Sequence, residues 1–432
     1  MRKAHYPAGP LQRTGLEYWY QERRTLVDFR RGPLGPHFDS FAAALKRNGY
    51  YFTYGRGILG LSCQFNWYLI DRGITQAADI TEDLIEPFLD AALAGVRSSS
   101  DNYTPRGSAR SRLKHLFAFL YGTNVILRPQ PRALAEPYDW ILDPFLGHLR
   151  TEHQVTQRTV DRHRELLRPF LDRLKGSVSP SRLRAVDAST VDRHLREHLK
   201  SNPNNVRSLT SSLRVFLRYC AARGHTRADF SGLVPRQRTY RHAALPKGVE
   251  DQALERLLGL MDRTTPLGAR DYAIVLLLMA YGVRGISAAE LLLDDIEWER
   301  ARIRFRARKG GKEVVMPLLD PVGEAIVQWL QHRFPSTPHR EVFLGVRAPH
   351  GPLTGLAVCQ LIRDYLTKAG VRMKGAGART LRHSWAIRAL AHDTPIKAIS
   401  DALGHRSIDT TFIYAKADLK TLREVAMPWP GD

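Results

Sequence analysis

Hydrophobic residues recur at helical spacing through much of the first half of the chain, with basic residues between them. Residues 38–128 carry one clear stripe, and residues 140–235 carry two. Such stripes predict amphipathic helices, whose apolar sides form a core and whose basic sides stay outside it. The stripes consist of Leu113, Leu116, Phe117 and Leu120, then of Val160, Leu166, Leu167, Phe170, Leu171 and Leu174, and finally of Leu209, Leu213, Phe216, Leu217 and Cys220.

The two helical blocks share an order of parts. In each, a long amphipathic helix leads to an acidic turn, at 79–83 or 187–192, and then to a short helix, a polar loop and a basic helix. This order predicts two copies of one small DNA-gripping module, over residues 35–130 and 137–236. Two unrelated helical bundles remain the alternative, because pairs of helices often look alike in sequence.

The chain changes character after residue 248. Two short runs, 303–306 and 313–316, are rich in β-branched, aromatic and alternating residues, and the Gly-containing segment 308–312 joins them, which indicates a hairpin. Helical patterns precede and follow this pair. Residues 249–432 are therefore expected to form one domain of helices with a small antiparallel sheet.

The predicted fold class is mainly α, with a small antiparallel sheet (α+β) in the C-terminal domain. The modules before that domain are expected to be helical, SAM-like DNA-binding units. Residues 1–34 are rich in Arg, Gly and Pro, which predicts a basic, extended N-terminal arm with at most one short helix.

Charge adds a partner to this picture. The 432 residues hold 65 Lys and Arg against 43 Asp and Glu, and the net charge of +22 favours a polyanion, above all nucleic acid. The basic helices expected in the second module have the arginine density of phosphate-contacting surfaces. Their predicted DNA-binding residues are Arg158, Arg162, Arg207, Arg214 and Arg218.

Several other classes of protein are disfavoured. No run of about 18 apolar residues occurs, so no membrane span is expected. The three cysteines are widely spaced and the 16 histidines show no metal-binding spacing, so neither a disulfide framework nor a metal site is predicted. A G-x-G-x-x-G match at 55–60 lies in a helical block, which argues against a nucleotide cofactor. The expected location is the cytoplasm, in association with the nucleoid.

The last fifty or so residues hold the candidate chemistry. Arg379, Arg382 and His405 precede Tyr414 there. Fixed cations bind a phosphate, an imidazole moves a proton, and a phenol oxygen attacks phosphorus without help from a metal. Taken alone, Tyr414 would be interpreted as a core aromatic residue, but beside these cations it becomes a candidate nucleophile.

Five motifs follow one another between residues 281 and 414. They are Tyr281-Gly-Val-Arg284, Lys309-Gly-Gly-Lys-Glu, Arg379-Thr-Leu-Arg382-His383, Leu403-Gly-His405 and Tyr414. Each is weak alone, but in this order and spacing they resemble the catalytic domain of the tyrosine recombinases, the phage-integrase family. The two helical blocks resemble the core-binding module of that family, present twice.

The resemblance implies a role for each of these residues. Tyr414 would attack a DNA phosphodiester and become linked to the 3′-phosphate, while Arg284 and Arg382 hold the non-bridging oxygens. Lys309 would protonate the leaving 5′-oxygen. His405 would hydrogen-bond the phosphate or help to move a proton. Neither a metal nor a cofactor is implied.

Two positions depart from the family pattern. Arg379 stands where the family usually has a histidine, and Ser287 where it usually has an acidic residue. Arginine neutralises phosphate but accepts no proton, so Arg379 is not a general base. His383 is expected to replace that histidine only in part, because it neighbours Arg382 and should point elsewhere on a helix. Lys312 is the second candidate for the catalytic lysine.

The sequence thus predicts a site-specific DNA recombinase, the integrase or transposase of a mobile element, that works through a covalent 3′-phosphotyrosine. Four protomers, identical or mixed, would act on two double-stranded DNA sites. Two alternatives stay open: a catalytically weak or inactive DNA-binding subunit, which the two departures favour, and a type IB topoisomerase-like enzyme. The tail 418–432 is a candidate contact to a neighbouring subunit.

Overall fold

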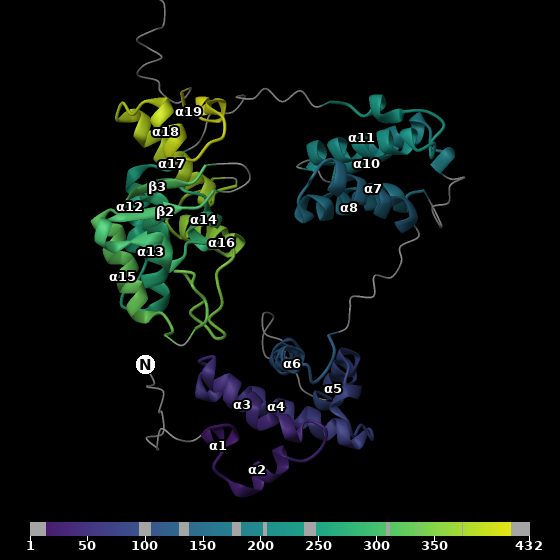
Figure 1. Ribbon diagram of the computed structural model, residues 1–432, viewed down its shortest axis with the longest axis vertical. Coiled ribbons are helices and arrows are strands. Elements are labelled where there is room, and N and C mark those ends of the chain that lie inside the picture. The colour runs from purple at the N-terminus through teal and green to yellow at the C-terminus, as the bar shows by residue number, and fades with distance from the viewer. Residues whose placement is uncertain are drawn as a thin grey trace, which may run out of the picture. The chain divides into compact units, whose positions relative to one another are not determined.

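The chain divides into two compact units, one of residues 1–128 with 244–432 and one of residues 129–243. Each is described by itself, from a computed structural model (Figure 1). The four predicted domain boundaries stay predictions. Lys309 and the tail lie outside the residues that the structure describes, which are 14–94, 105–128, 138–174, 183–201, 205–236, 248–307, 312–335, 337–373 and 375–415.

The N-terminal helices enclose a core of their own. The predicted stripe of α6 is confirmed, since all four of its apolar residues are buried. None of the helices in the described part of the chain is both long and apolar enough to cross a membrane. The helices of this region are α1 (Leu16–Trp19), α2 (Arg23–Phe29), α3 (Gly35–Arg47), α4 (Phe52–Asp71), α5 (Ile85–Ala92) and α6 (Pro105–Gly122).

The extended arm predicted for residues 1–34 is wrong from residue 16 onward. Leu16, Trp19 and Phe29 are buried in the N-terminal core, and the Trp19 indole donates a hydrogen bond to the Ala42 carbonyl at 3.0 Å. Burying two large aromatic side chains outweighs the local preference of Gly and Pro for loops. Gly55 of the G-x-G-x-x-G match lies inside α4, where a Cβ would come within 2.3 Å of the Trp19 ring. That glycine therefore makes room for Trp19.

The second unit has its own core, which four helices of its described residues enclose. The predicted stripes of α8 and α11 are buried there, apart from the half-buried Leu174. Asp187 accepts a hydrogen bond from the Thr190 amide at 2.8 Å, so the predicted acidic turn caps α10. The helices are α7 (Asp139–Glu152), α8 (Gln157–Asp172), α10 (Ala188–Ser201) and α11 (Val206–Ala222).

The helices of the two regions pack in the same order. Helix α3 packs on α4 as α7 packs on α8. Helix α4 packs on α6 as α8 packs on α11, and α5 packs on α6 as α10 packs on α11. This shared order supports the predicted duplication of one module, which remains a prediction.

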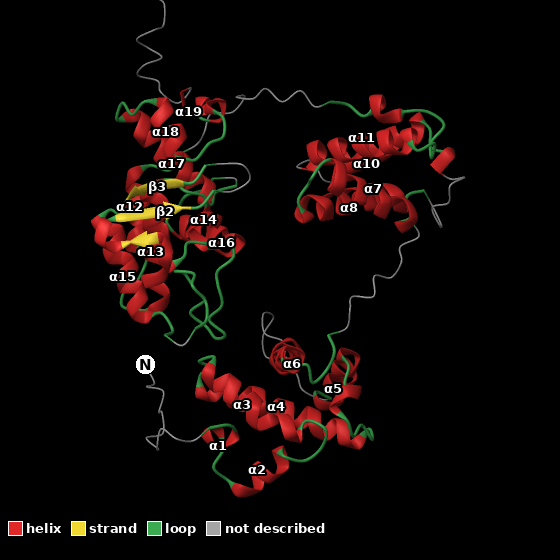
Figure 2. Cartoon of the chain, in the orientation of Figure 1, coloured by secondary structure: helices red, strands yellow, loops and turns green. Residues whose placement is uncertain are grey.

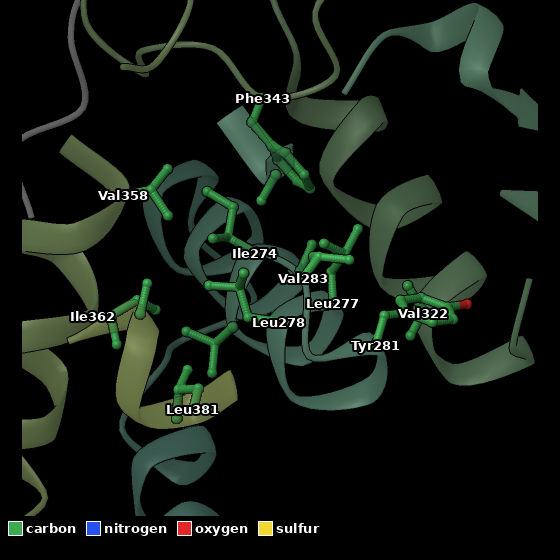
Figure 3. Packing of buried hydrophobic residues seen from close by; sticks show 14 of the residues in the cluster. Ile274, Leu277, Leu278, Tyr281, Val283, Val322, Phe343, Val358, Ile362 and Leu381 are labelled. Carbon is green, nitrogen blue, oxygen red and sulfur yellow. The ribbon is translucent and has the colours of Figure 1, made fainter. Parts of the chain in front are cut away.

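The C-terminal region is built around α13, which is apolar on every side from Ala273 to Ala280, as expected of a helix buried in a core, and carries the buried ion pair of Arg270 with Asp271 nearer its start. Figure 3 shows Ile274, Leu277 and Leu278 of this helix among the buried side chains that surround it. The helices are α12 (Asp251–Gly259), α13 (Pro266–Tyr281), α14 (Gly285–Ala289), α15 (Asp320–His332), α16 (Gly355–Lys368), α17 (Ala378–Ala391), α18 (Ile396–Ala402) and α19 (Phe412–Ala415).

The predicted small antiparallel sheet is confirmed, within a mainly helical fold (Figure 2). Its order is β1–β2–β3, and Ile303 of β2 pairs with Met316 of β3. The predicted runs correspond to β2 and β3, each within one residue. No residue pattern predicted β1, which is only two residues long. The strands are β1 (Ile296–Glu297), β2 (Arg302–Phe305) and β3 (Val314–Pro317).

The turn after α13 places the first arginine of the site. Tyr281 donates a hydrogen bond to the Pro317 carbonyl at 2.9 Å and accepts one from the Leu319 amide at 3.0 Å, so the end of α13 is tied to the end of β3. Gly282 follows with φ at +60°, a left-handed conformation that ends the helix. The chain then reverses, and Arg284 becomes the N-cap of α14.

Replacing Gly282 with alanine is expected to lower the free energy of unfolding by about 2–4 kcal/mol. A Cβ there would lie 2.8 Å from the Trp385 ring, which a hydrogen bond to the Ala280 carbonyl holds in place. Gly370 is the matched control, because its φ is +82° but nothing lies within 4 Å of a Cβ. Gly370→Ala should cost only about 1–2 kcal/mol. Equal losses in urea unfolding would show that the Trp385 contact is unimportant.

Candidate active site

A basic hollow lies between the start of α14, the β2–β3 hairpin and the end of α18. Arg284, Arg306, Lys312 and Arg382 line it, together with Ser287 and apolar residues. Arg284 and Lys312 are exposed. Four cationic side chains around one small hollow form a strong site for a phosphate group.

Arg382 is buried and fixed at the back of this hollow. Only 8% of its surface is exposed. Its guanidinium donates to the Gly282 carbonyl at 3.0 Å, to the Leu403 carbonyl at 2.8 Å and to Nε2 of His405 at 2.8 Å. Guanidinium has five N–H donors, so two remain for a ligand. Burial, with the nearby charge of Arg284, lowers the pKa of Arg382 to about 10, and the group stays charged at neutral pH.

His405 is neutral and its proton position follows from its partners. Because Arg382 has donors only, Nε2 of His405 accepts, and the ring proton lies on Nδ1. That Nδ1 donates to the Thr411 hydroxyl at 2.7 Å. Burial, with the charges of Arg382 and Arg284, lowers the pKa of His405 to about 4. In this arrangement His405 holds Arg382 in place.

Because the pKa of His405 is lowered, we expect this residue to make a contribution to the free energy of unfolding that is lost in acid. Its folded-state value of about 4 lies below the unfolded value of about 6.5, so the unfolded state binds more protons between these pH values. The contribution is therefore full above about pH 6.5 and is lost as the pH falls toward 4. The His405→Gln variant should lose less stability between pH 7.5 and pH 5 than the wild type does, by urea unfolding. The exposed His392 provides the control, since His392→Gln should keep the wild-type difference.

Tyr414 lies in the short helix α19 and contacts His383 of α17. Its hydroxyl is 2.9 Å from Nδ1 of His383. The expectation that His383 would point away from the site is wrong. Neighbouring residues on a helix lie about 100° apart, so Arg382 and His383 line two sides of one site that wraps around α17.

Tyr414 is also a core residue, as its apolar sequence context alone indicates, and its role as nucleophile stays a prediction. It is 3% exposed and packs with Ala386, Ile399 and Leu403. Burial raises the pKa of its hydroxyl above the ordinary value, and the charges of Arg382, Arg379 and Arg284 offset only part of that rise. These arginines favour the phenolate form that a nucleophile passes through.

The structure thus gathers most of the predicted site residues. Arg284, Arg382, His405 and Tyr414 come together from four segments, and the exposed Arg379 acts on the Tyr414 hydroxyl through its charge. Their catalytic roles stay predictions.

The sequence indicated one participant only in part and a second not at all. His383 is expected to replace the missing histidine only partly, although it lies four residues after Arg379 and hence on the same helix face. Arg306, which also forms an ion pair with the buried Asp295 at 2.9 Å, follows β2 and carries no motif that would have marked it.

The predicted DNA-binding arginines differ in exposure. Arg158, Arg207 and Arg218 are exposed, while Arg162 and Arg214 are half-buried. Arg214 donates to two backbone carbonyls beyond α11, and Arg162 bonds to side chains of its own module. Arg214 therefore has a structural role, and the contacts of all five with DNA remain predictions.

Comparison with known proteins assigns the chain to a family. The model of the phage integrase family matches residues 248–420. The protein y4rA of Sinorhizobium fredii, named as an integrase/recombinase, is 31% identical over 409 residues, which span 93% of this chain and 96% of the relative. The chain belongs to the phage integrase family. It is a tyrosine recombinase, an enzyme of site-specific DNA recombination.

The relatives of this recombinase differ in how much of it they cover. A second integrase/recombinase of S. fredii, y4rF, is 31% identical over 98% of the chain and 99% of its own length. Tyrosine recombinase XerD of Listeria innocua is 27% identical, but its match spans 66% of the chain and 96% of XerD. The longer form of this recombinase is therefore shared with the two S. fredii proteins.

Solved structures show the fold of this recombinase. A lambda integrase dimer bound to a core site is 15% identical and covers 62% of the chain and 95% of its own, with a TM-score of 0.51. XerH bound to its difH substrate is 17% identical, and the match covers 81% of this chain and 95% of the XerH chain, with a TM-score of 0.50.

Proposed function

We propose that this recombinase cuts and rejoins double-stranded DNA through a covalent bond between Tyr414 and a 3′-phosphate. The observation that carries the proposal is the convergence of Tyr414 with Arg284, Arg382 and Arg379, whose charges all act on its hydroxyl. A buried phenol among cations is suited to attack a bound phosphate diester, because the developing negative charge is met by fixed positive groups.

The basic hollow, whose Arg284 and Arg382 act on the Tyr414 hydroxyl through their charge, receives the scissile phosphate. Arg284 and the two free donors of Arg382 hold its non-bridging oxygens. His405 acts on the phosphate through Arg382. Lys309 protonates the 5′-oxygen as its bond to phosphorus breaks, and Lys312, which lines the hollow, is the second candidate for that step. Arg379 adds positive charge where relatives of this family use a histidine.

The DNA partner is an end or attachment site of a mobile element. The helical modules of residues 35–130 and 137–236 and the catalytic domain of residues 249–432 close around the duplex, and the module arginines contact its phosphates. The net charge of +22 supports this, and affinity should fall steeply with salt. Four protomers, of one or two kinds, assemble on two sites, in the cytoplasm and in association with the nucleoid.

A two-site reaction tests this proposal. Two linear duplexes of different length, each with a site from the protein's own element, are incubated with the protein in EDTA. Recombinant products that need both sites are the expected result. If the protein, given a supercoiled plasmid that lacks any such site, relaxes that plasmid, it would instead be a topoisomerase-like enzyme. Tight binding without cleavage would identify a DNA-binding subunit that needs an active partner.

A further inference from the structure

His383 contacts the candidate nucleophile, and no step of the proposed function uses it. Its Nδ1 lies 2.9 Å from the Tyr414 hydroxyl oxygen, and the two ring centres are 5.5 Å apart. α17 and α19 pack against each other, so this contact joins two neighbouring elements of the site. A hydrogen bond of this length is within the reach that a general base needs.

We propose that His383 is the general base that takes the proton of Tyr414 as the phenol oxygen attacks DNA. The proposal rests on the proposed function, since it needs Tyr414 as nucleophile. The O–H proton passes to the lone pair of Nδ1 while the phenol oxygen bonds to phosphorus. The bond from phosphorus to the 5′-oxygen breaks, and that oxygen takes a proton from Lys309 or Lys312. Religation reverses each transfer and returns the proton from His383 to Tyr414.

The other groups near Tyr414 are not suited to this step. Both ring nitrogens of His405 are occupied, one by Arg382 and the other by Thr411. Arg379 has no lone pair that accepts a proton. Within the described part of the chain, no carboxylate shifts the pKa of the Tyr414 hydroxyl. His383 is therefore the group placed to accept its proton.

Bound DNA would strengthen this base. Burial lowers the pKa of His383, and so do the charges of Arg379 and Arg382 on the same helix. Of the elements packed on α17, α19 contributes Tyr414, and none of the described residues of α13, α16 or α18 adds a charge that shifts this pKa. The ring is thus neutral in the free protein and ready to accept a proton. A phosphate bound to the arginines would offset their charge and make the protonated ring easier to form.

The experiment measures single-turnover cleavage of a nicked duplex carrying the protein's own site, from about pH 5.5 to about pH 10, a range that spans the ordinary pKa values of histidine and tyrosine. His383→Asn keeps a polar atom near the position of Nδ1, and His383→Gln is the second variant. The wild-type rate should rise with pH and then level off. Both variants should be about 100- to 10,000-fold slower and should still rise at the highest pH, because the phenol must ionise unaided.

Two controls separate this role from others. His392→Asn changes an exposed histidine at the end of the same helix and should keep the wild-type profile. A substrate with sulfur in place of the bridging 5′-oxygen has a leaving group that needs no proton. It should relieve the defect of Lys309→Ala, or of Lys312→Ala if that lysine is the acid, and leave the defect of His383→Asn unchanged.

Three results would overturn the proposal. The first is cleavage by folded His383→Asn at nearly the wild-type rate with the wild-type profile. The second is relief of its defect by the sulfur substrate. The third is a wild-type cleavage rate that keeps rising with pH over the whole measured range. This result would overturn the proposal even if both variants fail to fold. An adduct formed by Tyr414→Phe would instead refute Tyr414 as the nucleophile and with it the proposed function.

Discussion

The Tyr414→Phe variant is expected to bind its DNA site as tightly as the wild type and to cut none of it. The change removes one oxygen and keeps the ring, which packs with Ala386, Ile399 and Leu403. In well-studied enzymes, loss of the nucleophile lowers the catalytic rate by up to about 10⁶-fold. Gel-shift and cleavage measurements on one nicked duplex give both quantities.

Tyr365 offers a matched control for this change. Its hydroxyl donates a hydrogen bond to Asp271 at 3.1 Å, within the same domain but on α16. Tyr365→Phe also removes one hydrogen-bonded phenol oxygen, so it should leave cleavage intact. Residual cleavage by Tyr414→Phe at a rate close to that of Tyr365→Phe would mean that another residue attacks the DNA.

The Arg382→Ala variant is expected to lose cleavage by at least about 1,000-fold and to be less stable as well. Its guanidinium connects the turn after α13, the end of α18 and His405, and alanine would leave all three acceptors without their donor. Arg382→Lys keeps the charge, but one ammonium cannot span three acceptors and a phosphate, so a loss of about 100-fold or more is expected.

Arg388 provides the comparison for Arg382 on the same helix. It bonds to Asp251 and to the Met279 carbonyl, away from the hollow. Arg388→Lys should cleave DNA at nearly the wild-type rate. Cleavage rates and urea unfolding, measured for all three variants, separate catalysis from stability. A fully active Arg382→Lys would contradict the role of a guanidinium held at several points.

Much of this architecture follows from local patterns. The apolar stripes of α6, α8 and α11 predicted which residues are buried, because a helix with one apolar face has few other ways to cover it. The strands β2 and β3 could be placed because a Gly-containing turn joined two β-prone runs. The order of motifs from Arg284 to Tyr414 identified the family, since several weak signals in one order are specific together.

The errors arose where distant residues decide the outcome. Trp19 fills a space that Gly55 leaves open, and nothing near residue 19 in sequence announces that partner. His383 was judged by its neighbour Arg382, whereas its true partner comes from α19, 31 residues away in sequence. Arg306 lines the hollow because β2 ends there, which depends on the pairing of the sheet. Lys309 lies outside the described residues. Cleavage of the sulfur-containing substrate by the Lys309→Ala and Lys312→Ala variants therefore decides which lysine is the acid.

The covalent mechanism is tested by identifying the protein atom that becomes joined to DNA. Wild-type protein is incubated in EDTA with a nicked duplex from its own element, the adduct is digested with trypsin, and the DNA-linked peptide is sequenced by mass spectrometry. Peptide 407–416 is the expected product, joined through Tyr414 to a 3′-phosphate, with a free 5′-hydroxyl on the released strand. A link to another residue, a link to a 5′-phosphate, or tight binding without any adduct would contradict this mechanism.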